Sequence, residues 1–177
     1  MNDFSDRILL TGPRKSRSSH FRAYVLILIP LCAILFQVYV PKFIPSLAYL
    51  ELPLLVTVYF SLMRRQPVSG CLIGAGIGLV QDSLSHEPLG MFGIVKTLVG
   101  YFAASVSQRF DVENVMLRFF LSLFFFIFHQ FFYWVMERAL LNRVLDFDVA
   151  QAAMFGLLNA IVSLPLFAVL DKLKETG

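Results

Sequence analysis

Five side chains that could take part in catalysis crowd one short stretch of an otherwise apolar chain. They are Asp82, Ser83, Ser85, His86 and Glu87. Serine, histidine and a carboxylate are the groups that hydrolases combine for nucleophilic catalysis, so this stretch suggests a hydrolytic site. It lacks the G-x-S-x-G motif of a nucleophile elbow, and Pro88 follows it, as is common where a polar turn leads into a helix. We therefore expect a turn rather than an active site, and we do not expect an enzyme.

Three ionisable residues, Glu51, Asp82 and Lys96, interrupt long apolar segments. A charge placed in the hydrocarbon of a membrane costs at least about 2.5–3.5 kcal/mol, so each one needs a partner or a route to water. If the segments cross a membrane in alternating directions, all three residues lie in its outer half. We interpret them as a candidate intramembrane polar cluster. The alternative is that Asp82 faces water at the end of its helix and that the Lys96 side chain extends to the lipid headgroups.

Two more polar residues, His129 and Asn159, lie near the middle of apolar segments. No series of acids accompanies them, so we favour hydrogen bonds between helices over a proton pathway. The three histidines are scattered along the chain, and the two cysteines lie in different segments without a pairing pattern. We expect no metal ion and no cofactor.

The elements that must position these residues are predicted by composition. The chain has 177 residues, of which 58% are hydrophobic and 15% charged, and its mean hydropathy is +0.72. Soluble domains contain about 45–50% apolar and about 25% charged residues, so this chain lacks the polar surface of a soluble globule. Six segments approach the roughly 20 apolar residues of a membrane-crossing helix: 23–40, 44–63, 68–84, 89–107, 115–136 and 149–170. We predict an all-α, polytopic membrane helix bundle with six transmembrane helices.

The positive residues predict the orientation of this bundle, because cytoplasmic loops carry an excess of lysine and arginine. Eleven lie on the side that holds both termini: Arg7, Arg14, Lys15, Arg17, Arg22, Arg64, Arg65, Arg109, Arg118, Lys172 and Lys174. The opposite side has three, Lys42, Arg138 and Arg143. We therefore expect both termini in the cytoplasm.

The same patterns divide the chain into three parts. Residues 1–22 form a basic cytoplasmic N-terminal arm, residues 23–170 a single six-helix transmembrane domain, and residues 171–177 a cytoplasmic C-terminal tail. We interpret the Ser-rich, basic arm as a flexible segment that enforces orientation and contacts anionic headgroups.

Glycines recur every four residues in the segment 68–84, at Gly70, Gly74 and Gly78. This spacing places them on one face of a helix, where the absence of side chains lets another backbone approach closely. They are candidate helix-packing residues. We expect this helix to be the buried centre of the bundle.

The segment 115–136 has the opposite character, with an aromatic stripe at Phe120, Phe124, Phe128 and Phe132. The helical spacing places these rings on one side of the helix. Lipid contact alone could account for them, but such a dense row of flat rings also suits a surface for another helix. We interpret the stripe as a candidate partner-facing surface.

In the stretch from Gly78 to Gly90, a glycine-rich segment ends in Asp82, a short turn follows, and Pro88-Leu89-Gly90 opens the next segment. This pattern resembles the MreD family of bacterial rod shape-determining membrane proteins. Other residues are similar to that family as well: Pro53 and Tyr59 before a basic loop, Gly100-Tyr101, and Asn159 with Pro165. The resemblance covers residues 50–172, and the basic arm lies outside it.

This resemblance implies a non-enzymatic, multi-pass protein of the bacterial inner membrane that serves peptidoglycan elongation and rod cell shape. The expected partners are membrane lipid and an MreC-like single-span periplasmic protein, with MreB, RodA and the elongation transpeptidase in the same machine; nucleic acid is not expected. The family is also similar in fold to the vitamin-binding subunits of energy-coupling-factor transporters. A small-molecule binding subunit is therefore the alternative function. The resemblance implies no catalytic residues.

Overall fold

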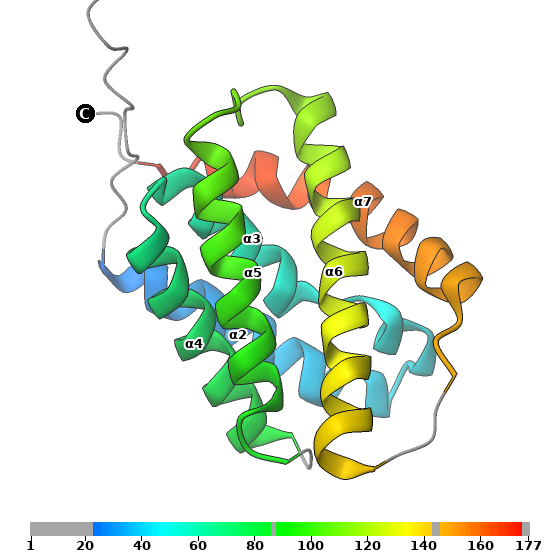
Figure 1. Ribbon diagram of the computed structural model, residues 1–177. Coiled ribbons are helices and arrows are strands. Elements are labelled where there is room, and N and C mark those ends of the chain that lie inside the picture. The colour runs from blue at the N-terminus through cyan, green and yellow to red at the C-terminus, as the bar shows by residue number, and fades with distance from the viewer. Residues whose placement is uncertain (1–22, 86–87, 143–145, 175–177) are drawn as a thin grey trace, which may run out of the picture.

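The computed structural model describes residues 23–85, 88–142 and 146–174, and its regular secondary structure there is entirely helical (Figure 1). The elements in chain order are α2 (Ala23–Tyr39), η1 (Val40–Lys42), η2 (Pro45–Tyr49), α3 (Leu52–Arg64), α4 (Pro67–Leu84), α5 (Met91–Ser107), α6 (Val115–Leu141) and α7 (Val149–Asp171). Six α-helices thus occur in the described part of the chain, one at each predicted segment.

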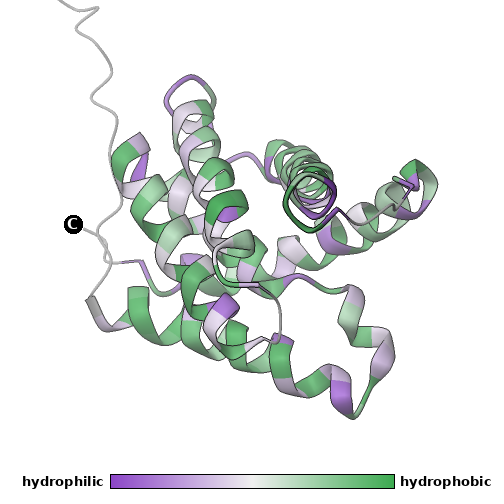
Figure 2. Ribbon diagram, turned by 60° about the horizontal axis from the view of Figure 1, so that its bottom comes forward, coloured by the Kyte–Doolittle hydropathy of each residue, from purple (hydrophilic) through white to green (hydrophobic). Residues whose placement is uncertain are grey.

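Four stretches are long and apolar enough to cross a membrane: Tyr24–Lys42, Pro45–Arg64, Val115–Leu141 and Val149–Asp171. The helix α5 is also apolar but shorter. Large apolar side chains face outward over much of the bundle; Ile27 on α2 and Leu72 on α4 are each 69% exposed. Figure 2 shows hydrophobic residues along most of the helices and hydrophilic ones gathered mainly near their ends and in turns. Such an apolar exterior suits lipid rather than water, so the chain is an integral membrane protein.

The second predicted helix differs from the expectation, because it is broken. The predicted segment 44–63 corresponds to the apolar stretch Pro45–Arg64, but this stretch is not one continuous helix: the 3₁₀ helix η2 ends at Tyr49, and α3 begins only at Leu52. Pro53 lies in the first turn of α3, where a residue without an N–H group starts a helix but cannot continue one. The chain therefore turns at Leu50 and Glu51, and the polar backbone of this break lies inside an apolar bundle.

The centre of the bundle is α3, and the expectation that the segment 68–84 forms it is wrong. Every residue from Pro53 to Met63 is buried, whereas α4 buries little beyond the face of Gly70, Gly74 and Gly78. The opposite side of α4 is open, and Val68 there is 74% exposed. The helix α3 contacts α2, α4, α5, α6 and α7. The glycine helix is a peripheral element that packs on one side.

The contact between α4 and α5 is the closest in the bundle, because the two backbones touch. A Cβ atom added at Gly70, Gly74 or Gly78 would overlap the backbone of α5. The obstructing carbonyls belong to Gly100, Lys96 and Phe92, respectively. A Cβ atom at Gly76, on the same helix, would meet nothing within 4 Å. The close packing of α4 on α5 therefore depends on the absence of side chains at these three glycines.

Gly74→Ala is expected to force α4 and α5 apart, because its methyl group would collide with the Lys96 carbonyl. Overpacking of this kind costs roughly 1–3 kcal/mol, so the melting temperature of the purified protein and the yield of folded protein should both fall. The matched control is Gly76→Ala, whose methyl group enters open space. Equal melting temperatures for the two variants would contradict the backbone contact.

Candidate functional site

The break between η2 and α3 is held by one carboxamide on α7. The Asn159 Oδ1 atom accepts a hydrogen bond from the backbone N–H of Glu51 at 2.8 Å, and Nδ2 donates to the carbonyl of Tyr49 at 2.8 Å. Nδ2 also donates to the carbonyl of Phe155, one turn earlier on α7, at 2.9 Å. Asn159 is fully buried, so it supplies the partners that water cannot. It positions Glu51 at the start of α3.

Glu51 faces Lys96 across the bundle interior. Its Oε2 atom lies 4.0 Å from the Lys96 Nζ atom, and the Lys96 side chain is completely buried. Lys96 Nζ also lies 4.3 Å from the centre of the Phe92 ring and 3.4 Å from His129 Nε2. An ammonium group can only donate, so Nε2 is the acceptor in that contact. A carboxylate, an aromatic face and an imidazole thus compensate one buried positive charge.

Asp82, the third member of the predicted polar cluster, has a different role. Its carboxylate accepts backbone N–H bonds from Gly90 at 2.9 Å, Phe92 at 3.0 Å and Gly93 at 2.9 Å. Phe92 and Gly93 lie in the first turn of α5, where N–H groups have no partner within the helix, and Gly90 is the residue just before it. Gly90 precedes that turn with a φ of 99°, which favours glycine. Asp82 therefore caps α5, and no ion pair in the described chain joins it to Lys96.

His129 links α5 to α6 through its ring. Besides the contact with Lys96, it stacks on Phe92, with ring centres 6.1 Å apart, and on Tyr133 at 6.2 Å. It is almost completely buried, and its Nδ1 atom has no hydrogen-bond partner in the described structure. This placement is that of a packing residue with one polar contact.

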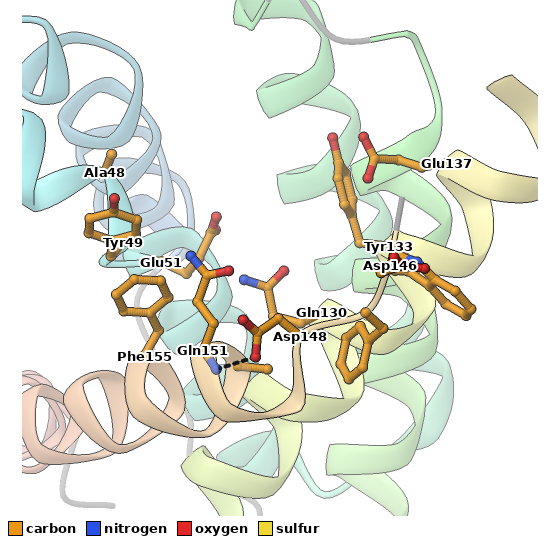
Figure 3. Close-up of a pocket in the computed structure, with 13 residues that line it drawn as sticks. Ala48, Tyr49, Glu51, Gln130, Tyr133, Glu137, Asp146, Asp148, Gln151 and Phe155 are labelled. Atoms are coloured by element: carbon orange, nitrogen blue, oxygen red, sulfur yellow. Dashed lines mark hydrogen bonds between the residues drawn. The ribbon is translucent and has the colours of Figure 1, made fainter. Parts of the chain in front are cut away.

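A cavity of about 350 Å³ opens beside Glu51, between η2, the end of α6 and the start of α7 (Figure 3). It is lined by Ala48, Tyr49, Glu51, Gln130, Tyr133, Trp134, Glu137, Asp146, Phe147, Asp148, Gln151, Ala152 and Phe155. We call this space the outer cavity, because it lies at the end of the bundle that the charge pattern predicts to face outward. Carboxylates and aromatic rings make up most of its wall. Two of these carboxylates have partners within the chain: Glu51 faces Lys96, and Asp148 accepts a hydrogen bond from the Gln151 N–H.

The opposite end of the bundle carries a second ionic group that the sequence patterns do not reveal. Arg118 on α6 pairs with Asp171 at the end of α7, and its Nε atom donates to the carbonyl of Val112 at 2.7 Å. Tyr59 on α3 donates to Asp171 at 2.9 Å. From the sequence, Arg118 is only one of the positive residues that predict the orientation of the bundle in the membrane. The sequence does show a positive residue near the start of α6 and a negative residue at the end of α7. It does not show that these two helix ends lie side by side.

The aromatic stripe on α6 divides into two halves. Phe120 and Phe124 are 60% and 54% exposed, whereas Phe128 and Phe132 are partly buried. The Phe128 ring packs on Phe102 of α5, with ring centres 5.4 Å apart. The exposed aromatic surface of α6 is therefore smaller than the predicted stripe.

The polar turn before α5 shows no catalytic arrangement in its described residues. Ser83 donates to the carbonyl of Leu79 within its own helix, and Asp82 is occupied by backbone N–H groups. His86 and Glu87 lie outside the described residues, as does the basic arm over 1–22. The described residues contain no group of histidine, cysteine and carboxylate side chains that could hold a metal ion.

A double-mutant cycle on Glu51 and Lys96 tests their pairing. Lys96→Met should destabilise the protein, because it strands a buried carboxylate, and Glu51→Gln combined with Lys96→Met should cost less than the sum of the single changes. Coupling between contacting residues is about 0.5–3 kcal/mol and is measurable from thermal or denaturant unfolding in detergent. The control cycle uses Asp82→Asn with Lys96→Met and should show weaker coupling. Additive effects for Glu51 and Lys96 would show that the two charges do not meet.

Comparison with known proteins identifies one family. A family model described as rod shape-determining protein MreD matches residues 18–175 of the chain. No curated protein and no solved structure matches. The match agrees with the resemblance of the stretch from Gly78 to Gly90, and it spans all of the helices described above.

Proposed function

The chain belongs to the MreD family of rod shape-determining proteins, and we propose that it is a non-enzymatic component of the cell-wall elongation machinery in the bacterial inner membrane. The match over residues 18–175 is the observation that carries this proposal. The apolar exterior of the bundle supports a place in a membrane. The polar turn before α5, in its described part, serves to cap a helix, which fits a structural role better than a hydrolytic one.

All six helices are proposed to cross the membrane, with both termini in the cytoplasm. The excess of positive residues on the terminal side supports this orientation. The outer end would then hold η2, the start of α5 and the outer cavity.

Cysteine labelling tests this topology in a background with Cys32→Ala and Cys71→Ala. Ser46→Cys, on the exposed η2, should react in intact spheroplasts with a maleimide that cannot cross the membrane. Thr176→Cys should react only after permeabilisation. Labelling of both positions from outside would contradict an even number of crossings.

The partner of this protein is proposed to be an MreC-like single-span protein, whose helix packs on the exposed half of α6. Phe120 and Phe124 support this proposal, because both side chains are more than half exposed on a helix that is otherwise packed on α7 and α5. MreB, RodA and the elongation transpeptidase would belong to the same machine, as the family resemblance implies. The protein would maintain the rod shape of the cell by holding these proteins together as a scaffold.

Phe120→Ala with Phe124→Ala should reduce recovery of the MreC-like protein by affinity purification at least several-fold, because it removes two large rings from the proposed contact. It should also produce rounded cells. The matched control is Ile27→Ala with Leu28→Ala, which trims two similarly exposed side chains on α2. Full recovery with the α6 variant would rule out this face as the binding surface.

A second candidate function is a small-molecule binding subunit of an energy-coupling-factor-type transporter. The outer cavity favours it, because polar and aromatic groups line a space beside the connection from α6 to α7. Purification of the protein together with an ATPase module, rather than with a single-span periplasmic protein, would support this function over scaffolding.

A further inference from the structure

We propose that phosphatidylglycerol, an anionic phospholipid with a hydroxyl-bearing headgroup, binds along α2 and α4. One acyl chain would lie in an apolar groove between the two helices, and the headgroup would lie in a polar pocket at the outer end of that groove. The proposal concerns lipid recognition and does not depend on which protein partner the chain has.

The apolar groove, of about 290 Å³, is formed by α2 and α4 alone. It is lined by Leu26, Ile27, Pro30, Leu31 and Ile34 of α2 and by Leu72, Ile73, Gly76, Ile77 and Val80 of α4. Every lining residue is apolar. On each helix the lining residues span about 12 Å, close to half of the roughly 30 Å of hydrocarbon in a bilayer. The groove therefore has the chemistry and the length that suit one acyl chain of a single leaflet.

A polar pocket of about 260 Å³ continues this groove toward the outer end of the bundle. It is lined by Gln37, Val38, Lys42, Glu51, Gln81, Leu84, Ser85 and Phe92. On α4 the groove ends at Val80, and the pocket begins at the next residue, Gln81. On α2 the pocket begins at Gln37, less than one turn after Ile34. The two spaces thus lie end to end, apolar and then polar, in the order of the acyl chain and the headgroup of a phospholipid.

Two amide oxygens of the pocket lack hydrogen-bond donors. Gln81 is 3% exposed, and its Oε1 atom has no partner in the described structure. Gln37 donates through Nε2 to the carbonyl of Ala48 at 3.3 Å, but its buried Oε1 atom has no partner there either. A buried acceptor without a donor is unfavourable, and a hydroxyl group is a donor that carries no charge. An occupant with hydroxyl groups would therefore stabilise this pocket.

The charge of the pocket favours an anionic lipid over a zwitterionic one. Lys42 is exposed in the wall, with its Nζ atom 5.0 Å from the centre of the Tyr39 ring. Glu51 is the only carboxylate among the described residues of the wall, and it faces Lys96 at 4.0 Å. The wall thus offers a positive charge to a phosphate group, whereas its one negative charge is already compensated. Phosphatidylglycerol supplies both the phosphate and the hydroxyl groups.

Matched lipids test the role of the hydroxyl groups. The full-length protein in a neutral detergent is titrated with phosphatidylglycerol and with phosphatidylpropanol, which has the same charge and acyl chains but no headgroup hydroxyl. Native mass spectrometry of the lipid-bound protein should show phosphatidylglycerol binding at least about fivefold tighter, because its hydroxyl groups satisfy buried acceptors. Equal affinities would overturn the proposal. A stable dimer that binds neither lipid would assign the groove to a second copy of the chain and overturn it as well.

Near-isosteric variants locate the headgroup. Gln81→Met removes the amide and should reduce the preference for phosphatidylglycerol over phosphatidylpropanol by at least about twofold. Gln37→Met removes the other amide and decides the outcome if Gln81→Met does not fold. The matched control is Gln151→Met, at an exposed position of α7, which should keep the preference of the wild type. A preference that survives in both pocket variants, or that falls equally in the control, would contradict this site.

Gly76→Leu tests the position of the acyl chain. Gly76 is exposed, and a Cβ atom there would meet nothing within 4 Å, so a leucine side chain would enter the groove. Binding of both lipids should weaken several-fold while their ratio stays unchanged. The matched control is Ala153→Leu, which adds an apolar side chain at an exposed position of α7 and should bind like the wild type. Unchanged binding in Gly76→Leu would contradict an acyl chain in the groove.

Discussion

The close approach of α4 and α5 is the constraint on which the rest of the bundle depends. Backbone meets backbone at Gly70, Gly74 and Gly78, so the rotation and the height of α5 relative to α4 are set with little freedom. With that height set, the first turn of α5 lies against Asp82 at the end of α4. The same placement brings Lys96 to the interface of α3 and α6, where it meets Glu51 and His129.

Several buried polar side chains of this bundle lie beside a helix end or a helix break whose backbone groups need partners. Asp82 satisfies the N–H groups of α5, and Asn159 satisfies the backbone between η2 and α3. Arg118 and Asp171 join the start of α6 to the end of α7. Unsatisfied polar groups in an apolar environment are costly, so these side chains are structural requirements as much as functional ones. Glu51 and Lys96 differ from these, because they form an ion pair across the bundle interior, with Oε2 and Nζ 4.0 Å apart.

Two surfaces of different chemistry follow from this architecture. The exposed half of α6 is apolar and aromatic and suits a helix within the membrane. The outer cavity is lined mainly by acidic and aromatic residues of η2, α6, α7 and the segments beside them. Both surfaces include residues of α6, but at different positions along it.

The sequence by itself determined the class of this protein. Hydropathy and segment length are properties of consecutive residues, so the all-helical membrane bundle, its six helices and most of their bounds could be read from the chain. The stretch from Gly78 to Gly90 was enough to identify the family, and the match of the family model over residues 18–175 confirms it. Glu51 and Pro53 interrupt the apolar segment 44–63 in the sequence, but the sequence does not show that the helix divides there into η2 and α3, because an apolar run does not show where a helix stops.

Only the tertiary structure decided which helix is central and which charges meet. In a membrane the lipid-facing side of a helix is as apolar as the core-facing side, so hydropathy could not distinguish α3 from α4. The pairing of Asn159 with Glu51 joins residues 108 positions apart, and that of Arg118 with Asp171 joins residues 53 apart. Depth along the membrane places Glu51, Asp82 and Lys96 at similar levels, but the rotation of each helix about its axis decides which of them touch. That rotation is set by packing against neighbours, and it is also what assembles the outer cavity from η2, α6 and α7.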